Sequence, residues 1–457
     1  MEQPAAFDPH TRSHRSAPRL DHYWMPFTAN RAFKRDPLMV QRAKGIHYFA
    51  NDGRAIIDGT SGLWCANAGH CRPEIANRVA SQLYKLDYAS SFQVGHEASF
   101  ELAERLAALL PPGLDRLFFA NSGSEGVDTA LKIALLYHAR RGESGRNKLV
   151  GRQRGYHGVN CGGTSVGGID QNRLGFGTLL SNAYHIRHTH DLERNAFTRG
   201  QPRLGAELAD DLESFAEAND PTTIAAVIVE PLAGSTGVLP PPVGYLERLR
   251  AICDRYSILL IFDEVITGFG RVGADFACKK YGVTPDIVVL AKAITNGAVP
   301  MSAVAASRTI HDAIVAGGED IEFCHGYTLS GCPVACAAAL ATLEIHRAEG
   351  LSERASNMSR VLEDAVHDLR DLPGVIDIRN DGMAAAVEFD PTWPHAAYAA
   401  FRESFLAGLL VRSTGNVIAI SPPLIAQPHD IELICSRLRM AVSRVFSDRA
   451  VVEGTAS

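Results

Sequence analysis

A lysine directly after a strongly apolar run is the residue of this sequence with the clearest chemical potential. Lys292 follows the run Ile-Val-Val-Leu-Ala at residues 287–291. Burial disfavours the charged form of an ammonium group, so a lysine at such a place tends to lose its proton. A desolvated, neutral amine is what Schiff-base chemistry with an aldehyde requires. A lysine whose stem runs along the edge of a sheet and keeps its charge in water fits the same pattern equally well.

Two adjacent carboxylates, Asp263 and Glu264, follow a second apolar run at residues 258–262. Carboxylates at the end of such a run are costly unless they meet a cation or hydrogen-bond donors. In open α/β sheets, ligands bind at the carboxyl ends of the strands. An aspartate fixed there could keep the proton on a ring nitrogen. A structural ion pair and a metal-binding carboxylate are the alternatives.

Two further motifs could bind a phosphate group and an aromatic ring. Ser122, Gly123 and Ser124 stand between an expected strand and an expected helix, where free N–H groups and the positive end of the helix dipole suit an anion. A plain helix cap is the alternative. Tyr156 and His157 stand between two glycines, and the tyrosine could stack on a planar ring or lie in a surface turn. Taken together, the four motifs supply what pyridoxal 5'-phosphate needs: an anion cradle, an aromatic face, a carboxylate and an amine.

A fifth motif, Gly-Phe-Gly-Arg-Val-Gly at residues 268–273, has the GxGxxG spacing of dinucleotide-binding turns. Asp263 and Glu264 would lie near the anionic pyrophosphate and repel it, and Gly282 and Pro285 would soon end the following helix. A nucleotide site is therefore disfavoured. No GxxxxGK[ST] or HExxH motif occurs, and Cys332 and Cys336 are interpreted as packed thiols, so no metal is expected.

The elements that must position these residues follow from the apolar pattern. Near-continuous apolar runs alternate with helical patterns in the middle of the chain, which is typical of a parallel sheet buried on both faces in the α/β class. The strands are expected at residues 117–120, 148–151, 224–230, 257–265, 286–291 and 302–306, and helices at 125–141 and 243–256.

After Pro333 the pattern changes to a smaller α+β unit. Helices are expected at residues 334–348, 351–372, 394–407 and 429–446, and strands at 375–379, 384–389, 409–412 and 417–420. Short strands at 46–50 and 55–58 cannot form a core alone, so they complete this unit or cover the site. The predicted division is an N-terminal segment, 1–70, that contributes to the small domain, a large domain, 71–333, and a C-terminal small domain, 334–457.

Composition excludes several classes of protein. The chain has 457 residues and a net charge of −6, and no apolar run approaches the roughly 18 residues that a membrane span needs. The charge balance argues against binding nucleic acid, which depends on clustered cations. Nine cysteines without a CxxC pair indicate a reducing compartment, and residues 1–20 lack the apolar stretch of a secretory signal. The cytoplasm is therefore the expected location.

Five longer motifs stand out: SGSE at 122–125, GYHG at 155–158, FDEVITGFGR at 262–271, AKAITNGAVP at 291–300 and HGYT at 325–328. With these motifs, the chain resembles the class III pyridoxal-phosphate-dependent aminotransferases over residues 20–446. Within that family the sequence is most similar to the β-alanine (ω-amino acid):pyruvate aminotransferases. This similarity rests on HYWMPFTANR at 22–31, SGLW at 61–64, GTSVGG at 163–168 and VEPLAGSTGVLPPPVGYL at 229–246.

The resemblance implies a fold type I transferase, with a large domain around a mainly parallel seven-stranded sheet and a smaller α+β domain. It implies a homodimer or homotetramer with shared active sites. Lys292 would form the Schiff base and transfer protons, and Asp263 would bind the pyridinium nitrogen. The implied cofactor-binding residues also include Ser122, Gly123, Ser124, Tyr156, His157, Glu230, Val265 and, from the neighbouring subunit, Thr328. The implied substrate-binding residues are Phe27, Trp64, Phe92, Tyr156 and Arg412, and Arg412 would bind the carboxylate of the keto acid by a bidentate contact.

The expected reaction moves an amino group from an ω-amino acid or primary amine to pyruvate, with alanine as a product and ping-pong kinetics. After Arg412 the sequence departs from its relatives, since Ala419 stands where they carry a glutamine. The amine donor therefore stays open among β-alanine, taurine, γ-aminobutyrate, a diamine and an aromatic amine. A mutase or decarboxylase of the same fold and an NAD-dependent dehydrogenase are the more remote alternatives.

Overall fold

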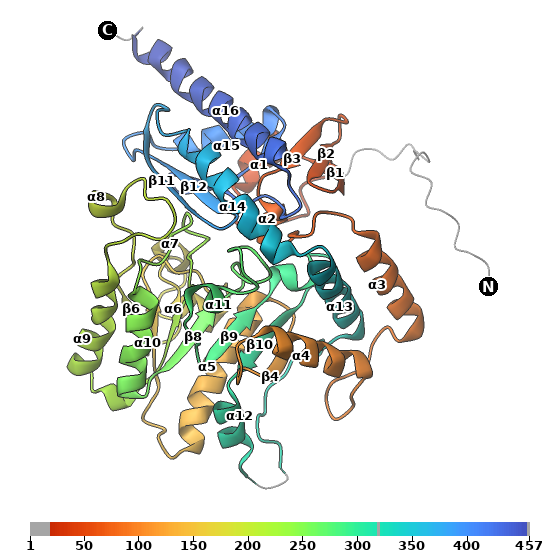
Figure 1. Ribbon diagram of the computed structural model, residues 1–457, viewed down its shortest axis with the longest axis vertical. Helices are drawn as coiled ribbons and strands as arrows, with labels where there is room; N and C mark the ends of the chain where they lie inside the picture. Colours follow the sequence, from red (N-terminus) through yellow and green to blue (C-terminus); the bar gives the residue numbers. More distant parts are fainter. Residues whose placement is uncertain (1–18, 318–319, 455–457) are drawn as a thin grey trace.

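A mainly parallel sheet lies at the centre of the molecule (Figure 1). The computed structural model describes residues 19–317 and 320–454. Seven strands lie in the order β4-β10-β9-β8-β7-β5-β6, and only β10 runs antiparallel to its two neighbours. The strands are Arg116–Ala120 (β4), Lys148–Arg152 (β5), Ala183–Ile186 (β6), Ile224–Val229 (β7), Leu259–Asp263 (β8), Ile287–Leu290 (β9) and Ser302–Ala306 (β10). The expected seven-stranded sheet of the α/β class is confirmed.

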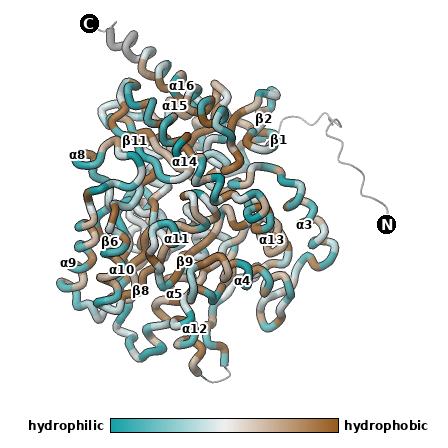
Figure 2. Tube along the Cα trace, viewed as in Figure 1, coloured by the Kyte–Doolittle hydropathy of each residue, from teal (hydrophilic) through white to brown (hydrophobic). Residues whose placement is uncertain are grey.

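Helices cover both faces of this sheet, which explains why its strands are apolar on both sides. Leu260 and Val288 face a core shared with α4 (Glu97–Leu109), α10 (Tyr245–Tyr256) and α13 (Pro333–Ala348). Ile261 and Val289 face the opposite core, which α5 (Gly123–Arg140) and α12 (Arg308–Val315) complete. Figure 2 shows β8 and β9 as a hydrophobic centre and more hydrophilic residues on outer elements such as α12.

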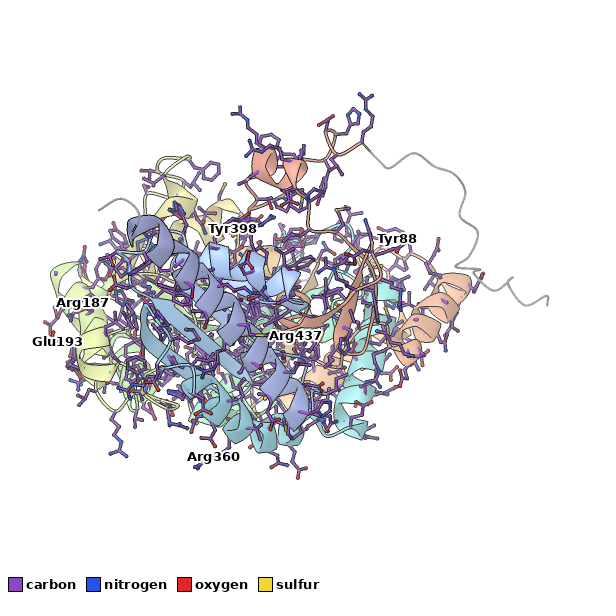
Figure 3. The ribbon with its side chains drawn as sticks, turned by 90° about the horizontal axis from the view of Figure 1, so that it is seen from above. Tyr88, Arg187, Glu193, Arg360, Tyr398 and Arg437 are labelled. Carbon is purple, nitrogen blue, oxygen red and sulfur yellow. The ribbon has the colours of Figure 1, made fainter. Side chains whose placement is uncertain are left out.

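Two four-stranded sheets build the second part of the molecule. One has the order β1-β2-β3-β13 and the other β11-β12-β15-β14. Their strands are Val40–Lys44 (β1), His47–Ala50 (β2), Ala55–Asp58 (β3), Leu409–Leu410 (β13), Val375–Asp381 (β11), Ala384–Phe389 (β12), Val417–Ile420 (β15) and Arg412–Thr414 (β14). The helices α14 (Leu351–His367), α15 (Ala396–Leu406) and α16 (Pro428–Gly454) accompany them. In the view from above, α15 and α16 lie side by side, and Arg437 of α16 donates to the Gly408 carbonyl at 2.5 Å (Figure 3).

The parallel pair β3–β13 joins the N-terminal segment to the C-terminal part of the chain. This pairing supports a small domain drawn from both ends, and the division at residues 70 and 333 stays our proposal. The remaining helices are Asn30–Arg35 (α1), Ser61–Trp64 (α2), Pro73–Lys85 (α3), Cys161–Val166 (α6), Asp170–Arg173 (α7), Leu192–Asn195 (α8), Asp210–Ala218 (α9) and Ala277–Tyr281 (α11), with short 3-10 turns at Ala206–Ala209 (η1), Pro221–Thr223 (η2) and Lys292–Thr295 (η3).

Several boundaries differ from the sequence-based expectation. The single strand expected at 409–412 is two strands, β13 and β14, because the chain passes from one sheet to the other there. Helix α5 begins at Gly123, two residues earlier than expected, with the Ser122 hydroxyl accepting the Glu125 N–H at 3.2 Å. Among the described residues, no helix combines the length and the apolar composition that crossing a bilayer takes.

A buried cation holds the two parts of the molecule together. Arg271 is fully buried, and its Nη1 donates to the carbonyls of Met383 and Pro422 at 2.8 and 2.7 Å. Its Nη2 donates to Ser61 Oγ at 2.8 Å and Asn67 Oδ1 at 2.6 Å. Burial lowers the pKa of Arg271 to about 9, while the Asp58 charge acts in the opposite direction. The segment with GxGxxG spacing therefore carries a structural arginine, and the helix after it, α11, has only five residues.

We expect Arg271→Met to destabilise the protein by about 3–5 kcal/mol, because four buried acceptors lose their charged donor at once. Urea denaturation followed by circular dichroism measures this difference. Arg255→Met is the control, since Arg255 is well exposed on α10. Equal stabilities of the two variants would contradict the joining role of Arg271.

Candidate active site

A cavity of about 330 Å³ opens at the carboxyl ends of the parallel strands. Glu230 follows β7, Asp263 ends β8 and Lys292 follows β9, so three neighbouring strands each deliver one ionisable group. The start of α5 and the loop after β5 complete the wall. The cavity thus brings together most of the expected cofactor-binding residues, namely Ser122, Gly123, Ser124, Tyr156, His157, Glu230, Asp263, Val265 and Lys292.

Lys292 has a strained backbone and a desolvated amine. Its φ of 51° lies in the left-handed region, which costs a non-glycine residue about 1–3 kcal/mol and is typical of functional sites. Burial lowers the pKa of the Lys292 amine, and the Arg412 charge acts in the same direction. Cys65, Asp263 and Glu230 oppose the shift. The amine is therefore closer to its neutral, nucleophilic form than a lysine in water.

The two adjacent carboxylates at the end of β8 have different environments. Asp263 lines the cavity, where its Oδ2 lies 2.8 Å from His157 Nδ1 and its Oδ1 accepts the Val265 N–H at 3.1 Å. Glu264 is fully buried, accepts Thr267 Oγ1 at 2.9 Å and binds the N–H groups of residues 277 and 278 at the start of α11. Asp263 is thus available to a ligand, whereas Glu264 caps a helix.

The N-terminus of α5 forms a cradle that only small residues allow. A Cβ on Gly123 would lie 3.1 Å from the Val265 side chain, and a Cβ on Gly158 would lie 2.5 Å from Ser124 Oγ. The hydroxyl of Ser124 accepts the Val159 N–H at 3.1 Å, which joins the cradle to the loop after β5. Free backbone N–H groups at a helix N-terminus bind phosphate well.

Glu230 links the aromatic wall of the cavity to the loop that follows β7. Its Oε1 accepts the Tyr156 N–H at 2.9 Å, and its Oε2 accepts the Gly234 N–H at 3.2 Å. Burial raises the pKa of Glu230 to about 7, with a further contribution from Asp263 and opposition from His157. An amine, a carboxylate for a ring nitrogen, an aromatic face and an anion cradle therefore meet in one cavity, as a phosphorylated pyridine aldehyde requires.

Of the expected substrate-binding residues, Tyr156 lines this cavity, and Phe27, Trp64, Phe92 and Arg412 do not. Phe27 is 68% exposed and meets the Tyr156 ring edge-on at 6.5 Å. Arg412, on β14, is near enough to Tyr156 for their charges to influence each other's pKa, and burial lowers the pKa of Arg412. Its strand partner Ala419 is buried and apolar. Trp64 lies in the core with its ring 5.9 Å from the Arg271 guanidinium and does not line the cavity.

Thr328 and Phe92 lie outside the cavity of their own chain. Thr328 is exposed, and its carbonyl accepts the Tyr88 hydroxyl at 3.0 Å. Phe92 is 56% exposed and packs beside Gly326, where an added Cβ would lie 2.8 Å from its ring. These positions leave the roles implied for Thr328 and Phe92 as predictions.

Cys65 and Ser235 are among the cavity residues that the sequence motifs did not single out. Cys65 lines the cavity and is close enough to Lys292 to affect its pKa. Its position directly after Trp64 in the SGLW motif was the available clue. Ser235 lines the cavity from the loop after β7, and its neighbours Gly234 and Thr236 are typical of a turn only.

Comparison with known proteins agrees with this geometry. Residues 28–442 match the aminotransferase class III family. An ω-aminotransferase of Caulobacter vibrioides is 54% identical, covering 93% of this chain and 98% of the relative. An ω-amino acid–pyruvate aminotransferase of Pseudomonas putida is 45% identical, covering 94% and 96%. The solved structure of an amine transaminase from an uncultivated Pseudomonas species, in its PLP-bound form, has a TM-score of 0.87 at 37% identity and covers 94% of this chain and 100% of that one.

Fold, site chemistry and family agree on the cofactor, because the class III aminotransferases use pyridoxal phosphate and the residues of the cavity fit it. The resemblance that the motifs indicated is confirmed, and so is the assignment to fold type I. The chain is a pyridoxal-phosphate-dependent transaminase and belongs to the class III aminotransferases.

Proposed function

We propose that this enzyme transfers an amino group from an ω-amino acid or primary amine to pyruvate, and gives alanine and a semialdehyde or ketone. The observation that carries the proposal is the meeting of Lys292, Asp263 and the α5 cradle in one cavity. The relatives named as an ω-aminotransferase and an ω-amino acid–pyruvate aminotransferase support the choice of substrates. One cavity serves both substrates in turn, so we expect ping-pong kinetics.

When bound, pyridoxal phosphate supplies an aldehyde and a ring that accepts electrons from the carbon bearing the amine. The N–H groups of Gly123 and Ser124 would bind the phosphate. Asp263 would keep a proton on the ring nitrogen, and His157 orients the Asp263 carboxylate through its 2.8 Å contact. Tyr156 and Val265, which both line the cavity, would contact the ring. Lys292 Nζ would be the base that takes the proton from the substrate carbon bearing the amine and gives it back during the transfer.

We further propose that two copies of the chain share their active sites. Large side chains of the N-terminal segment are exposed, among them Trp24 at 88% and Phe27, and Phe27 contacts the cavity residue Tyr156. A second copy that covered them would bring Thr328 of the partner subunit to the phosphate and complete the substrate pocket with Phe92 of the partner subunit. A homotetramer is a pair of such dimers. The nine free cysteines support a location in the cytoplasm.

Lys292→Ala should abolish transamination, with a loss of at least about a hundredfold in rate, because the proton-transferring amine is removed. An independent readout is covalent trapping. Borohydride should fix the cofactor to the native enzyme, as intact mass shows, and should leave the variant unlabelled. Lys279→Ala, on the surface of α11, is the control and should behave like the native enzyme. An active Lys292→Ala enzyme would contradict the role proposed for Lys292.

Glu230→Gln should flatten the dependence of stability on pH in the cofactor-free protein. Because the folded chain raises the pKa of Glu230 from 4.5 to about 7, the folded state holds a proton that the unfolded state has lost. The stabilisation is present in full below pH 4.5 and is lost as pH rises through 7. Between pH 5 and 8 the native protein should lose up to about 3 kcal/mol more than the variant, as urea denaturation measures. Glu344→Gln, an exposed substitution, should keep the native slope, and equal slopes for all three proteins would contradict the burial argument.

A donor panel with pyruvate as acceptor tests the substrates. β-Alanine, γ-aminobutyrate, taurine, a diamine and an aromatic amine are compared with α-amino acids, and the alanine formed is measured. Arg412→Met should raise the KM for donors that carry a carboxylate by about tenfold or more, since a charged hydrogen bond is lost. The half-reaction with an amine that carries no carboxylate should stay nearly unchanged. Turnover of α-amino acids alone would contradict the proposed donor class. Alanine formed in proportion to pyruvate consumed argues against a mutase or decarboxylase.

A further inference from the structure

The loop at residues 233–239, which we call the cavity loop, has an unusual backbone. It closes on itself through hydrogen bonds between Ala233 and Leu239 at 3.2 and 2.9 Å. Ser235 lines the cavity, and the Gly234 N–H binds Glu230. Gly237 and Val238 have φ values of 108° and 52°. A β-branched residue with positive φ is a true outlier and persists only where its surroundings hold it.

Arg379, on β11 of the small domain, supplies that restraint. Its Nε donates to the carbonyls of Gly237 and Val238 at 3.1 and 3.2 Å, and its Nη2 donates to the Gly237 carbonyl at 2.9 Å. The two carbonyls belong to the residues with positive φ. A Cβ on Gly237 would lie 3.1 Å from Arg379 Nη2 and 2.9 Å from Val417, so only glycine allows this approach.

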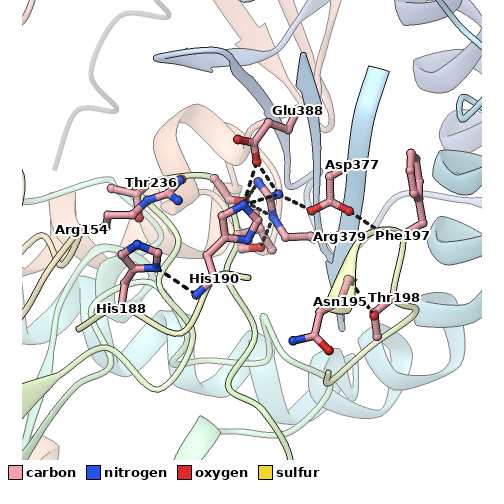
Figure 4. A network of polar contacts seen from close by, with 12 residues as sticks. Arg154, His188, His190, Asn195, Phe197, Thr198, Thr236, Asp377, Arg379 and Glu388 are labelled. Carbon is pink, nitrogen blue, oxygen red and sulfur yellow. Dashed lines mark hydrogen bonds and ion pairs between the residues drawn. The ribbon is translucent and has the colours of Figure 1, made fainter. Parts of the chain in front are cut away.

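Carboxylates on β11 and β12 fix the guanidinium in this place. Figure 4 shows Asp377 and Glu388 beside Arg379, whose Nη1 contacts both side chains. His190 Nε2 lies 3.2 Å from Glu388, and Asp377 also accepts the Phe197 N–H. His190, Asp377 and Glu388 are close enough to hold a metal ion. The Arg379 guanidinium already lies among them, so the arginine is the cation of this cluster.

We propose that Arg379 is a positioning residue for the transaminase reaction, acting from the small domain through the cavity loop. It does not line the cavity itself. By holding the carbonyls of Gly237 and Val238, it fixes Ser235 in the cavity wall and the Gly234 N–H on Glu230, which in turn binds the Tyr156 N–H. The small-domain sheet thereby determines the shape of a cavity that belongs mostly to the large domain.

The test compares Arg379→Lys with Arg354→Lys in the cofactor-loaded enzyme. Lysine keeps the charge but cannot bind two carbonyls and two carboxylates at once. Arg354 is the matched control, because its Nε and Nη2 also donate to backbone carbonyls, those of Leu424, Ile425 and Ala426. Neither Arg354 nor these three partners line the cavity.

Arg379→Lys should speed hydrogen exchange of a peptide covering residues 231–242 by about tenfold or more, and Arg354→Lys should not. Arg379→Lys should also raise the KM for the amine donor about tenfold and speed cofactor release. Its kcat should change by less than about threefold, since no group at the reacting atoms is removed. Asp377→Asn, which leaves Arg379 in place, is a second variant in case Arg379→Lys does not fold. It should move exchange and KM in the same direction by about threefold.

Unchanged exchange in this peptide, or equal changes in the arginine variant and its control, would overturn the proposal. So would a fall in kcat with KM unchanged. The kinetic arm rests on the proposed function, because it needs a donor that the native enzyme accepts. If the native enzyme accepts none of the donors, the proposed function fails, and hydrogen exchange and cofactor release still decide the role of Arg379.

Discussion

Burial of the ionisable groups at the carboxyl ends of β7, β8 and β9 is the constraint on which the rest of the structure depends. Glu230, Asp263 and Lys292 line one cavity there, and Glu230 and Asp263 are buried. In such a space each charge is expensive unless its neighbours compensate it. The raised pKa of Glu230 and the lowered pKa of Lys292 are two results of the same burial. Burial therefore shifts the pKa values of two ionisable groups that line the cavity.

The sequence predicted the part of the fold that depends on local pattern. Long apolar runs such as residues 224–230 became the central strands, because short runs rich in β-branched residues are typical of strands buried on both faces. β6, Ala-Tyr-His-Ile, was missed, since it is short and half-polar. The change of sheet between Leu410 and Arg412 was also out of reach, because it depends on strand partners more than 350 positions away in the case of β3.

The same distinction separates the site residues that could be predicted from those that could not. Lys292, Asp263 and the glycine-containing turns at the cradle carry local patterns, and the structure places them in one cavity. Ser235 has no such pattern, because the backbone that directs it toward the cavity is held by Arg379, over 140 residues away. The position of Trp64 follows from a turn in which Ser61, Leu63 and Trp64 all have positive φ, and no composition rule predicts such a turn. The positions of Ser235 and Trp64 depend on the fold around them and not on a local sequence pattern.

The pairing of β3 with β13 has a consequence for how the chain is synthesised. About 350 residues separate these two strands, and a ribosome adds about 5–20 residues per second. The N-terminal hairpin therefore waits roughly 20–70 s for its partner, while the seven-stranded sheet and the helices on its faces can already fold. During that interval β3 has β2 on one side and no strand on the other. Unpaired strand edges can pair with other chains and cause aggregation. β13 therefore closes a sheet whose other three strands were made about 350 residues earlier.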